Sequence, residues 1–174
     1  MIAFRAVFVV AMIAGCAGQP GDEATVPPEP TETIEGLVRV AGTAEANWVA
    51  LVTADTSLRV VGPLEIDIRT LEGARLRAAG APREGTGGGA GFYVTDYDVL
   101  EVDGEVPVVG TLLRVDSDFW IAQPDSLGGE RLQLIGVPSS IGQATGGKIW
   151  VVGIRGSSEI RVQSYGVIRR PPGP

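Results

Sequence analysis

The sequence predicts an all-β protein made of two similar small domains, and three observations lead to this prediction. Short apolar, β-branched runs recur along the chain and are bounded by Gly, Pro, Asp and Ser, as is typical of strands. No segment after residue 15 keeps a 3.6-residue apolar period over a dozen residues, so long helices are not expected. The order of these runs in the first half recurs in the second half.

The expected strands fall into two sets of five. Those of the first half are GLVRVAG, WVALVTAD, SLRVVG, ARLRAAGA and FYVTDYDVLEV. Those of the second half are PVVGTLLRV, FWIAQP, RLQLIG, KIWVVGI and IRVQSYGVI.

One short helix is predicted after the third strand of the first half, in PLEIDIRTLEG. Pro63 suits the first helical turn, because its missing N–H has no partner there, and Gly73 suits the C-terminal end. Leu64, Ile68 and Leu71 would then share one apolar face.

The two halves align at particular residues. Gly73 before the fourth strand corresponds to Gly147, and Tyr97 in the fifth strand corresponds to Tyr165. The offset changes at the glycine-rich loop 84–91, which is longer in the first copy. Length differences confined to loops are typical of duplicated domains.

Each copy reads strand, strand, strand, short helix or turn, strand, strand, and this order resembles the OB-fold, a five-stranded Greek-key barrel. The likeness extends over residues 34–170 and implies two tandem OB-like five-stranded barrels at 35–104 and 105–170. Two other small barrels, or a single β-sandwich, are the alternatives.

The N-terminus indicates export. Arg5 precedes an apolar run, Ala6 to Ala14, that is shorter than the roughly 20 residues needed to span a bilayer. A charged start, a short apolar segment and small residues at its end are typical of a signal peptide. Cys16 is the single cysteine of a chain without histidine, so internal disulfides, His-based triads and His-ligated zinc are excluded.

Ile13-Ala14-Gly15-Cys16 resembles the lipobox of bacterial lipoproteins. The resemblance implies that residues 1–15 are a signal peptide cleaved after Gly15, and that Cys16 becomes an acylated N-terminus which holds the protein on a membrane. Ala17 and Gly18 follow the cysteine in place of the Asp that favours inner-membrane retention in two-membrane cells. The expected location is therefore the cell envelope: the outer membrane facing the periplasm in such cells, and otherwise the outer face of the cell membrane. An ordinary secreted protein and an uncleaved anchor are the alternatives.

Residues 16–34 are rich in proline and acidic residues and predict an extended tether, and 171–174 predict a disordered tail. The formal net charge is −7, with a single lysine, Lys148. Because nucleic acids favour dense Lys and Arg, no nucleic-acid partner is expected.

Two glycine motifs resemble nucleotide-binding sequences, but neither is followed by the helix that such a site requires. GQATGGKI places Gly142, Gly147 and Lys148 as in a P-loop, yet Ile149 stands where Ser or Thr would bind magnesium, and a strand follows instead of a helix. GTGGGA at 85–90 likewise precedes a strand. No nucleotide and no other cofactor are therefore expected.

The acidic run Asp96, Asp98, Glu101, Asp103 and Glu105 is spread along a predicted strand, and no metal site is assigned to it. Aromatic side chains could form a ligand platform, for which Trp48, Phe119 and Trp120 are the best candidates, although core packing is their commoner role. No nucleophile with an activating base is found, so a non-enzymatic protein is expected.

The function expected from these residues is that of a lipid-anchored OB-type module that contacts another envelope component, with an envelope protein as its partner. A lipoprotein that binds small ligands or glycans is the alternative, and an unrecognised hydrolase comes third.

Replacing the proposed lipid attachment point gives the first test. Cys16→Ser should abolish acylation and release the protein from the membrane fraction, because the thiol is the acceptor of the diacylglyceryl group. Mass spectrometry of the membrane-bound protein would measure the modification. A native protein with an unmodified Cys16 thiol would contradict the prediction.

Overall fold

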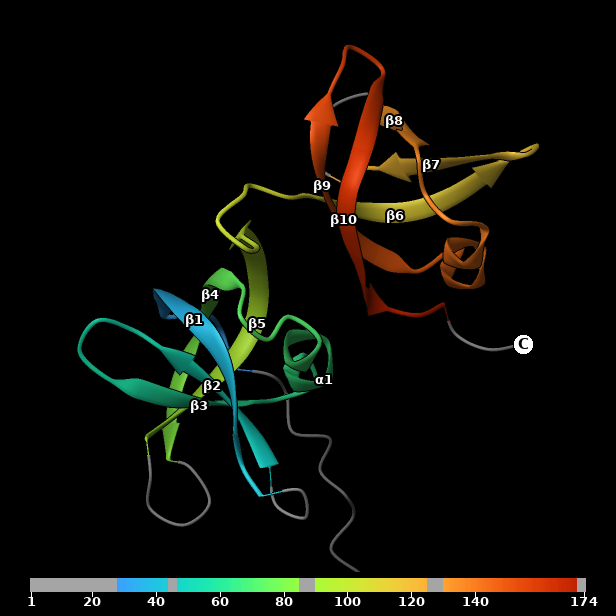
Figure 1. The fold of residues 1–174 in the computed structure, drawn as a ribbon. Coiled ribbons are helices and arrows are strands. Elements are labelled where there is room, and N and C mark those ends of the chain that lie inside the picture. Colours follow the sequence, from blue (N-terminus) through green and yellow to red (C-terminus); the bar gives the residue numbers. More distant parts are fainter. Residues whose placement is uncertain (1–27, 44–46, 85–89, 125–129, 172–174) are drawn as a thin grey trace, which may run out of the picture.

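The computed structural model describes residues 28–43, 47–84, 90–124 and 130–171 of the chain. They form mostly β structure in two five-stranded sheets (Figure 1). The first set of elements is β1 (Glu32–Gly42), β2 (Asn47–Val52), β3 (Ser57–Val61), α1 (Glu65–Arg69), β4 (Arg75–Glu84) and β5 (Ala90–Glu101). The second set is β6 (Val108–Val115), β7 (Asp118–Ala122), β8 (Arg131–Ile135), the 3-10 helix η1 (Ser139–Ala144), β9 (Lys148–Arg155) and β10 (Glu159–Arg169).

The first sheet closes on itself in the order β1-β2-β3-β5-β4. The long strand β1 allows this closure, because its first half pairs with β4 and its second half pairs with β2. All neighbours are antiparallel except β3 and β5, which run parallel, with Val60 opposite Phe92. No described strand of this sheet is left as a free edge, so its backbone groups are paired within the sheet.

The second sheet has the same strand order, β6-β7-β8-β10-β9, and also closes on itself. Its parallel pair is again formed by the third and fifth strands, with Ile160 of β10 opposite Leu134 of β8. In each sheet a short helical element, α1 or η1, lies between the third and fourth strands. The two halves of the sequence therefore fold with the same connectivity.

Two glycines occupy equivalent tight positions in the fourth strands. A Cβ on Gly80 would overlap the carbonyl oxygen of Tyr93, and a Cβ on Gly153 would overlap that of Arg161. The register between the fourth and fifth strands shifts beside each glycine, between Ala79 and Gly80 and after Val162. Such bulges bend a strand strongly, which a small closed sheet requires.

The interior of each sheet holds its own apolar cluster. The first is built on fully buried side chains such as Val38, Leu51 and Phe92, and the second on Leu112, Ile121 and Ile149. Side chains alternate between buried and exposed along the strands, as expected for sheets with one face on a core. The all-β prediction is confirmed at this level.

Helix α1 forms inside the predicted segment but begins later than predicted. Its first residue is Glu65, with Leu64 as the N-cap, so Pro63 precedes the helix instead of opening it. Gly73 takes a left-handed φ of +85°, which fits its expected place after the helix end. Ile68 and Leu71 are buried in the first cluster and Leu64 packs against it.

The tether predicted for residues 16–34 extends too far toward the C-terminus. Residues 32–34 already lie in β1 and pair with β4, where Ile34 stands opposite Ala78. The strand therefore begins in polar residues, before the apolar run from which its start was predicted. Pro171 of the predicted tail is half-buried, since its ring lies close to Gly146 and Gly147. The signal peptide, Cys16, most of the tether and residues 172–174 lie outside the described residues.

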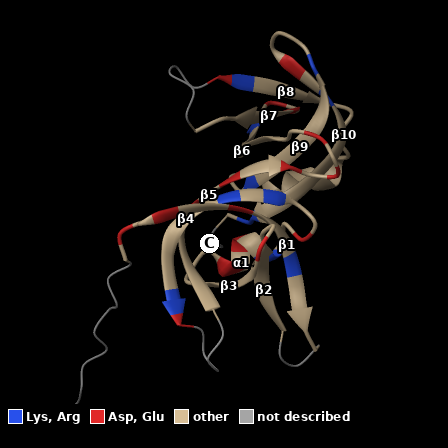
Figure 2. Cartoon of the chain, turned by 90° about the vertical axis from the view of Figure 1, so that its left-hand side faces the viewer, with Lys and Arg blue, Asp and Glu red and all other residues tan. Residues whose placement is uncertain are grey.

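None of the described helices combines the length and the apolar character needed to cross a membrane. Lys, Arg, Asp and Glu are interspersed over both sheets in the view of Figure 2, so neither sheet shows one sign of charge alone there.

The close approach at Gly80 gives a stability test. Gly80→Ala should lower the free energy of unfolding by about 1–3 kcal/mol, because the added methyl group meets a backbone oxygen that cannot rotate away. Gly156→Ala is the matched control: its Cβ would lie 3.1 Å from the flexible Cγ of Glu159. Urea denaturation measures both, and equal effects would contradict the account of the bulge.

Candidate functional site

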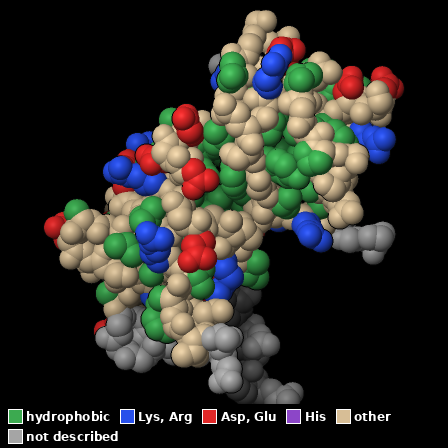
Figure 3. Space-filling model, in the orientation of Figure 1, with side chains coloured by type: hydrophobic (Ala, Val, Ile, Leu, Met, Phe, Trp, Pro, Cys, Tyr) green, Lys and Arg blue, Asp and Glu red, His purple; other side chains and the backbone are tan. Residues whose placement is uncertain are grey.

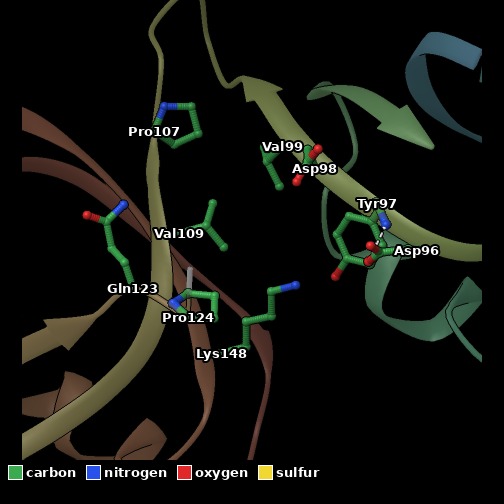
Figure 4. Close-up of a pocket in the computed structure, with 9 residues that line it drawn as sticks. All are labelled: Asp96, Tyr97, Asp98, Val99, Pro107, Val109, Gln123, Pro124 and Lys148. Atoms are coloured by element: carbon green, nitrogen blue, oxygen red, sulfur yellow. Dashed lines mark hydrogen bonds between the residues drawn. The ribbon is translucent and has the colours of Figure 1, made fainter. Parts of the chain in front are cut away.

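A cleft of about 630 Å³ lies between the two sheets (Figure 4). It is lined by Asp96, Tyr97, Asp98, Val99, Pro107, Val109, Gln123, Pro124 and Lys148. β5 of the first sheet supplies one wall. The other wall is supplied by β6 with the residue before it, by the two residues after β7 and by the start of β9. In the space-filling view, apolar side chains gather on the second sheet beside its junction with the first sheet (Figure 3).

Lys148 carries the cationic group of the cleft. It is the first residue of β9 and pairs with Thr111 of β6 and Arg169 of β10, so its backbone is held on both sides. Its Nζ atom lies 4.4 Å from the centre of the Tyr97 ring, within the range of a cation–π contact. Among the described residues no carboxylate lies within 4.0 Å of this ammonium group.

Tyr97 is the aromatic residue that lines the cleft. Its side chain is only 6% exposed, and its hydroxyl is buried with no hydrogen-bond partner among the described residues. The hydroxyl points toward Lys148 in Figure 4. Burial raises the pKa of the Tyr97 hydroxyl well above its ordinary value, and the negative charge of Asp67 raises it further. The group therefore stays protonated and remains a hydrogen-bond donor.

Asp96 and Asp98 flank Tyr97 on β5 and bring two carboxylates to the cleft. The Oδ1 atom of Asp96 accepts a hydrogen bond of 2.8 Å from the backbone N–H of Tyr97, which fixes the carboxylate beside the ring. Asp98 makes no hydrogen bond or ion pair with other described side chains. The cleft thus holds two negative charges and one positive charge.

An ion pair between α1 and β10 joins the two sheets. Asp67 of α1 is buried, with its side chain 7% exposed, and both of its carboxylate oxygens accept hydrogen bonds from Arg169 of β10. The Nε–Oδ1 distance is 3.1 Å. The hydrogen bond to Asp67 raises the pKa of the Arg169 guanidinium above its ordinary value. Thr70 adds a longer contact, with Oγ1 3.4 Å from the carbonyl oxygen of Ile168.

Apolar contacts continue across the same junction. Val152 and Ile168 of the second sheet are buried in the cluster that fills the first sheet, and Val109 and Trp150 pack against it. The indole of Trp150 lies against Gly166, where a Cβ would overlap the ring. The first apolar cluster therefore includes residues of both sheets, while the second cluster belongs to the second sheet alone.

The arrangement suits binding of charged groups. The Lys148 ammonium can donate hydrogen bonds to an anion, while Asp96 and Asp98 can accept them from a cation. Within the described part of the chain, no group of three or more His, Cys, Asp or Glu side chains is placed to hold a metal ion.

The aromatic residues predicted as a ligand platform are not brought together in this cleft. Trp48 is 37% exposed at the start of β2, in the first sheet. Phe119 and Trp120 are half-buried in β7 of the second sheet, where Phe119 packs against the second apolar cluster. Core packing therefore accounts for much of the surface of Phe119.

The important residues of the cleft were set aside or missed in the sequence. Lys148 stands out in the sequence through its P-loop-like spacing and as the single lysine, and β9 begins at this residue as predicted. The position of Asp67 in the sequence does indicate burial. In the predicted helix it falls on the same face as Leu64 and Leu71, which predicts a buried carboxylate that needs a partner.

Comparison with known proteins places the chain in no family. No protein-family model and no curated protein matches it. A solved structure, the crystal structure of the tetrameric p202 HIN2, matches over 81% of this chain and 94% of its own length, with 10% sequence identity and a TM-score of 0.27. At this TM-score the likeness supports no argument about what the chain binds.

The exclusion of nucleic acid as a partner is corrected here: the comparison with the p202 HIN2 structure gives it no support. The exclusion rested on acidic composition alone, and net charge averages over a surface on which basic residues can still gather locally.

The unpaired hydroxyl gives a test of the site. Tyr97→Phe should leave the free energy of unfolding at pH 7 unchanged or raise it by up to about 1 kcal/mol, because a buried hydroxyl without a partner costs free energy. Since the folded-state pKa of Tyr97 is raised, the native protein should lose stability as the pH rises above the unfolded-state value of about 10.

The Tyr97→Phe variant should lose less stability in that pH range, because it has no hydroxyl to ionise at this position. Thermal unfolding of both proteins at pH 7 and at about pH 10.5, just above the unfolded-state pKa of tyrosine, measures the effect. A large loss of stability for Tyr97→Phe at pH 7 would show that the hydroxyl has a structural partner.

Proposed function

We propose that this protein is a membrane-anchored lipoprotein of the bacterial cell envelope. Its folded body is a non-enzymatic binding module, and it contacts another envelope component through the cleft between the two sheets. The observation that carries the proposal is the cleft itself, in which the Lys148 ammonium has no carboxylate within 4.0 Å and the Tyr97 hydroxyl has no partner among the described residues.

The strand order supports tandem OB-like barrels as the frame of this module. Both sheets follow the order first, second, third, fifth, fourth, with the third and fifth strands parallel and a short helical element before the fourth. The OB-fold is a five-stranded Greek-key barrel that hosts binders of several classes. Because one fold serves many ligands, the proposed role rests on the cleft and not on the fold.

The anchor is proposed from the lipobox-like Ile13-Ala14-Gly15-Cys16. A proline-rich, acidic segment follows it and is unsuited to a packed core, so it could hold the folded body away from the bilayer. Ala17 and Gly18 favour the outer membrane facing the periplasm if the source has two membranes, and the outer face of the cell membrane otherwise.

Binding is favoured over catalysis by the side chains available. The chain has no histidine, and its one lysine contacts an aromatic ring whose hydroxyl has a raised pKa. A raised pKa makes the Tyr97 hydroxyl a poor nucleophile and a poor base at neutral pH. Charged and apolar groups of the cleft can still hold a ligand.

A lipoprotein that binds a small ligand or a glycan is the second candidate, and the size of the cleft favours it. Its volume of about 630 Å³ lies in the range of roughly 300–1,000 Å³ that is usual for small-molecule sites. The two candidates differ in whether the cleft contacts a macromolecule in the cell.

Site-specific photo-crosslinking in living cells separates them. A photoreactive residue in place of Pro124, which lines the cleft, should yield a covalent adduct with an envelope macromolecule. The matched control is the same residue in place of Val115, which is 43% exposed at the opposite end of β6. The Pro124 adduct should disappear with Cys16→Ser, because the body leaves the membrane.

Equal adducts from both positions, or none from Pro124, would overturn the proposed contact. The second of these results together with retention of a small molecule by the purified protein would favour the small-ligand candidate.

A further inference from the structure

The lining of the cleft contains unsatisfied hydrogen-bond donors at one place. The Tyr97 hydroxyl is buried without a partner among the described residues, and Figure 4 shows it facing the Lys148 ammonium group. Buried polar groups nearly always have hydrogen-bond partners, and leaving one unpaired costs free energy. The Lys148 ammonium above the Tyr97 ring has no carboxylate within 4.0 Å among the described residues, and it is matched by an anionic acceptor such as a carboxylate.

Asp96 and Asp98 bring negative charge to the β5 wall of the cleft. Asp98 is exposed and makes no ion pair with other described residues, and Asp96 is held in place by the backbone N–H of Tyr97. These two carboxylates favour a cation and disfavour a multiply charged anion such as phosphate. Val99, Pro107 and Val109 offer apolar surface between and around the charges.

We propose, on the basis of the binding role proposed above, that the cleft binds the C-terminal end of a peptide whose last residue carries a cationic side chain. The terminal carboxylate accepts a hydrogen bond from the Lys148 ammonium, and the side-chain nitrogen of the same residue pairs with Asp96 and Asp98. The aliphatic part of that side chain lies on the apolar wall. A C-terminal lysine or arginine combines these three chemistries in one residue, so one cleft can contact all of them.

The single lysine makes the test specific. Labelling the full-length protein with ¹³C-lysine marks Lys148 alone, and its Hε–Cε NMR signal reports contacts at the ammonium group. Three probes are titrated: the peptide Ac-Gly-Gly-Lys with a free C-terminus, the same peptide as the C-terminal amide, and Ac-Gly-Gly-Ala with a free C-terminus.

The free-acid lysine peptide should shift the Lys148 signal saturably. The amide lacks the carboxylate and the alanine peptide lacks the cation, so each should bind at least about ten-fold more weakly, as expected for loss of a charge-assisted hydrogen bond. Equal binding of all three peptides, or no shift with any of them at millimolar concentration, would overturn the proposal. Tighter binding of inorganic phosphate than of the lysine peptide would overturn it as well.

Calorimetry on variants assigns the two ends of the ligand. Lys148→Met should abolish discrimination between the free acid and the amide, and Asp98→Asn should reduce discrimination between lysine and alanine. Asp118→Asn is the matched charge control, because Asp118 lies at the far end of the β6–β7 hairpin. It should change neither preference, and an effect as large as that of Asp98→Asn would contradict the assignment.

The two proposals can fail separately. An adduct from the Pro124 position without peptide binding would retain the envelope contact and overturn the ligand class. Peptide binding without an adduct would retain the ligand class and overturn the contact with a macromolecule.

Discussion

The buried carboxylate of Asp67 is the constraint on which the relation between the two sheets depends. A charge removed from water must be paired, and the guanidinium that pairs it comes from Arg169, far along the chain in the last strand. Because Arg169 hydrogen-bonds both oxygens of the carboxylate, the pair fixes the orientation of β10 against α1 as well as its distance. Arg169 in turn stands opposite Lys148 in the register of β9 and β10, so the same contact positions the cationic wall of the cleft.

Apolar packing and the cleft accompany this ion pair at the junction of the two sheets. Val152 and Ile168 complete the core of the first sheet, and Trp150 lies on Gly166 at the junction. The Tyr97 ring is then buried beneath Lys148, with its hydroxyl unpaired among the described residues. Phenylalanine would fill the same space without the free-energy cost of burying an unpaired hydroxyl.

The sequence predicted the local features well and the junction poorly. Strand positions and Gly73 before the fourth strand could be predicted from short-range patterns, because a left-handed turn constrains the residue at that place. In the second sheet the left-handed glycine before the fourth strand is Gly146, and not the predicted Gly147. Boundaries were less certain: β1 begins in polar residues, and α1 begins after Pro63. The cleft could not be derived from local patterns, because Asp67 and Arg169, and likewise Tyr97 and Lys148, meet only after both sheets have formed.

The central claim is that the Asp67–Arg169 pair couples the two sheets into one unit, and hydrogen exchange on the full-length protein tests it most directly. Arg169→Met changes only the second sheet, yet it should speed amide exchange at Ile68, Leu71 and Tyr97 in the first. Arg155→Met, which breaks the exposed pair with Glu130, should leave those amides unchanged. Unchanged protection of the first sheet in Arg169→Met would contradict the account.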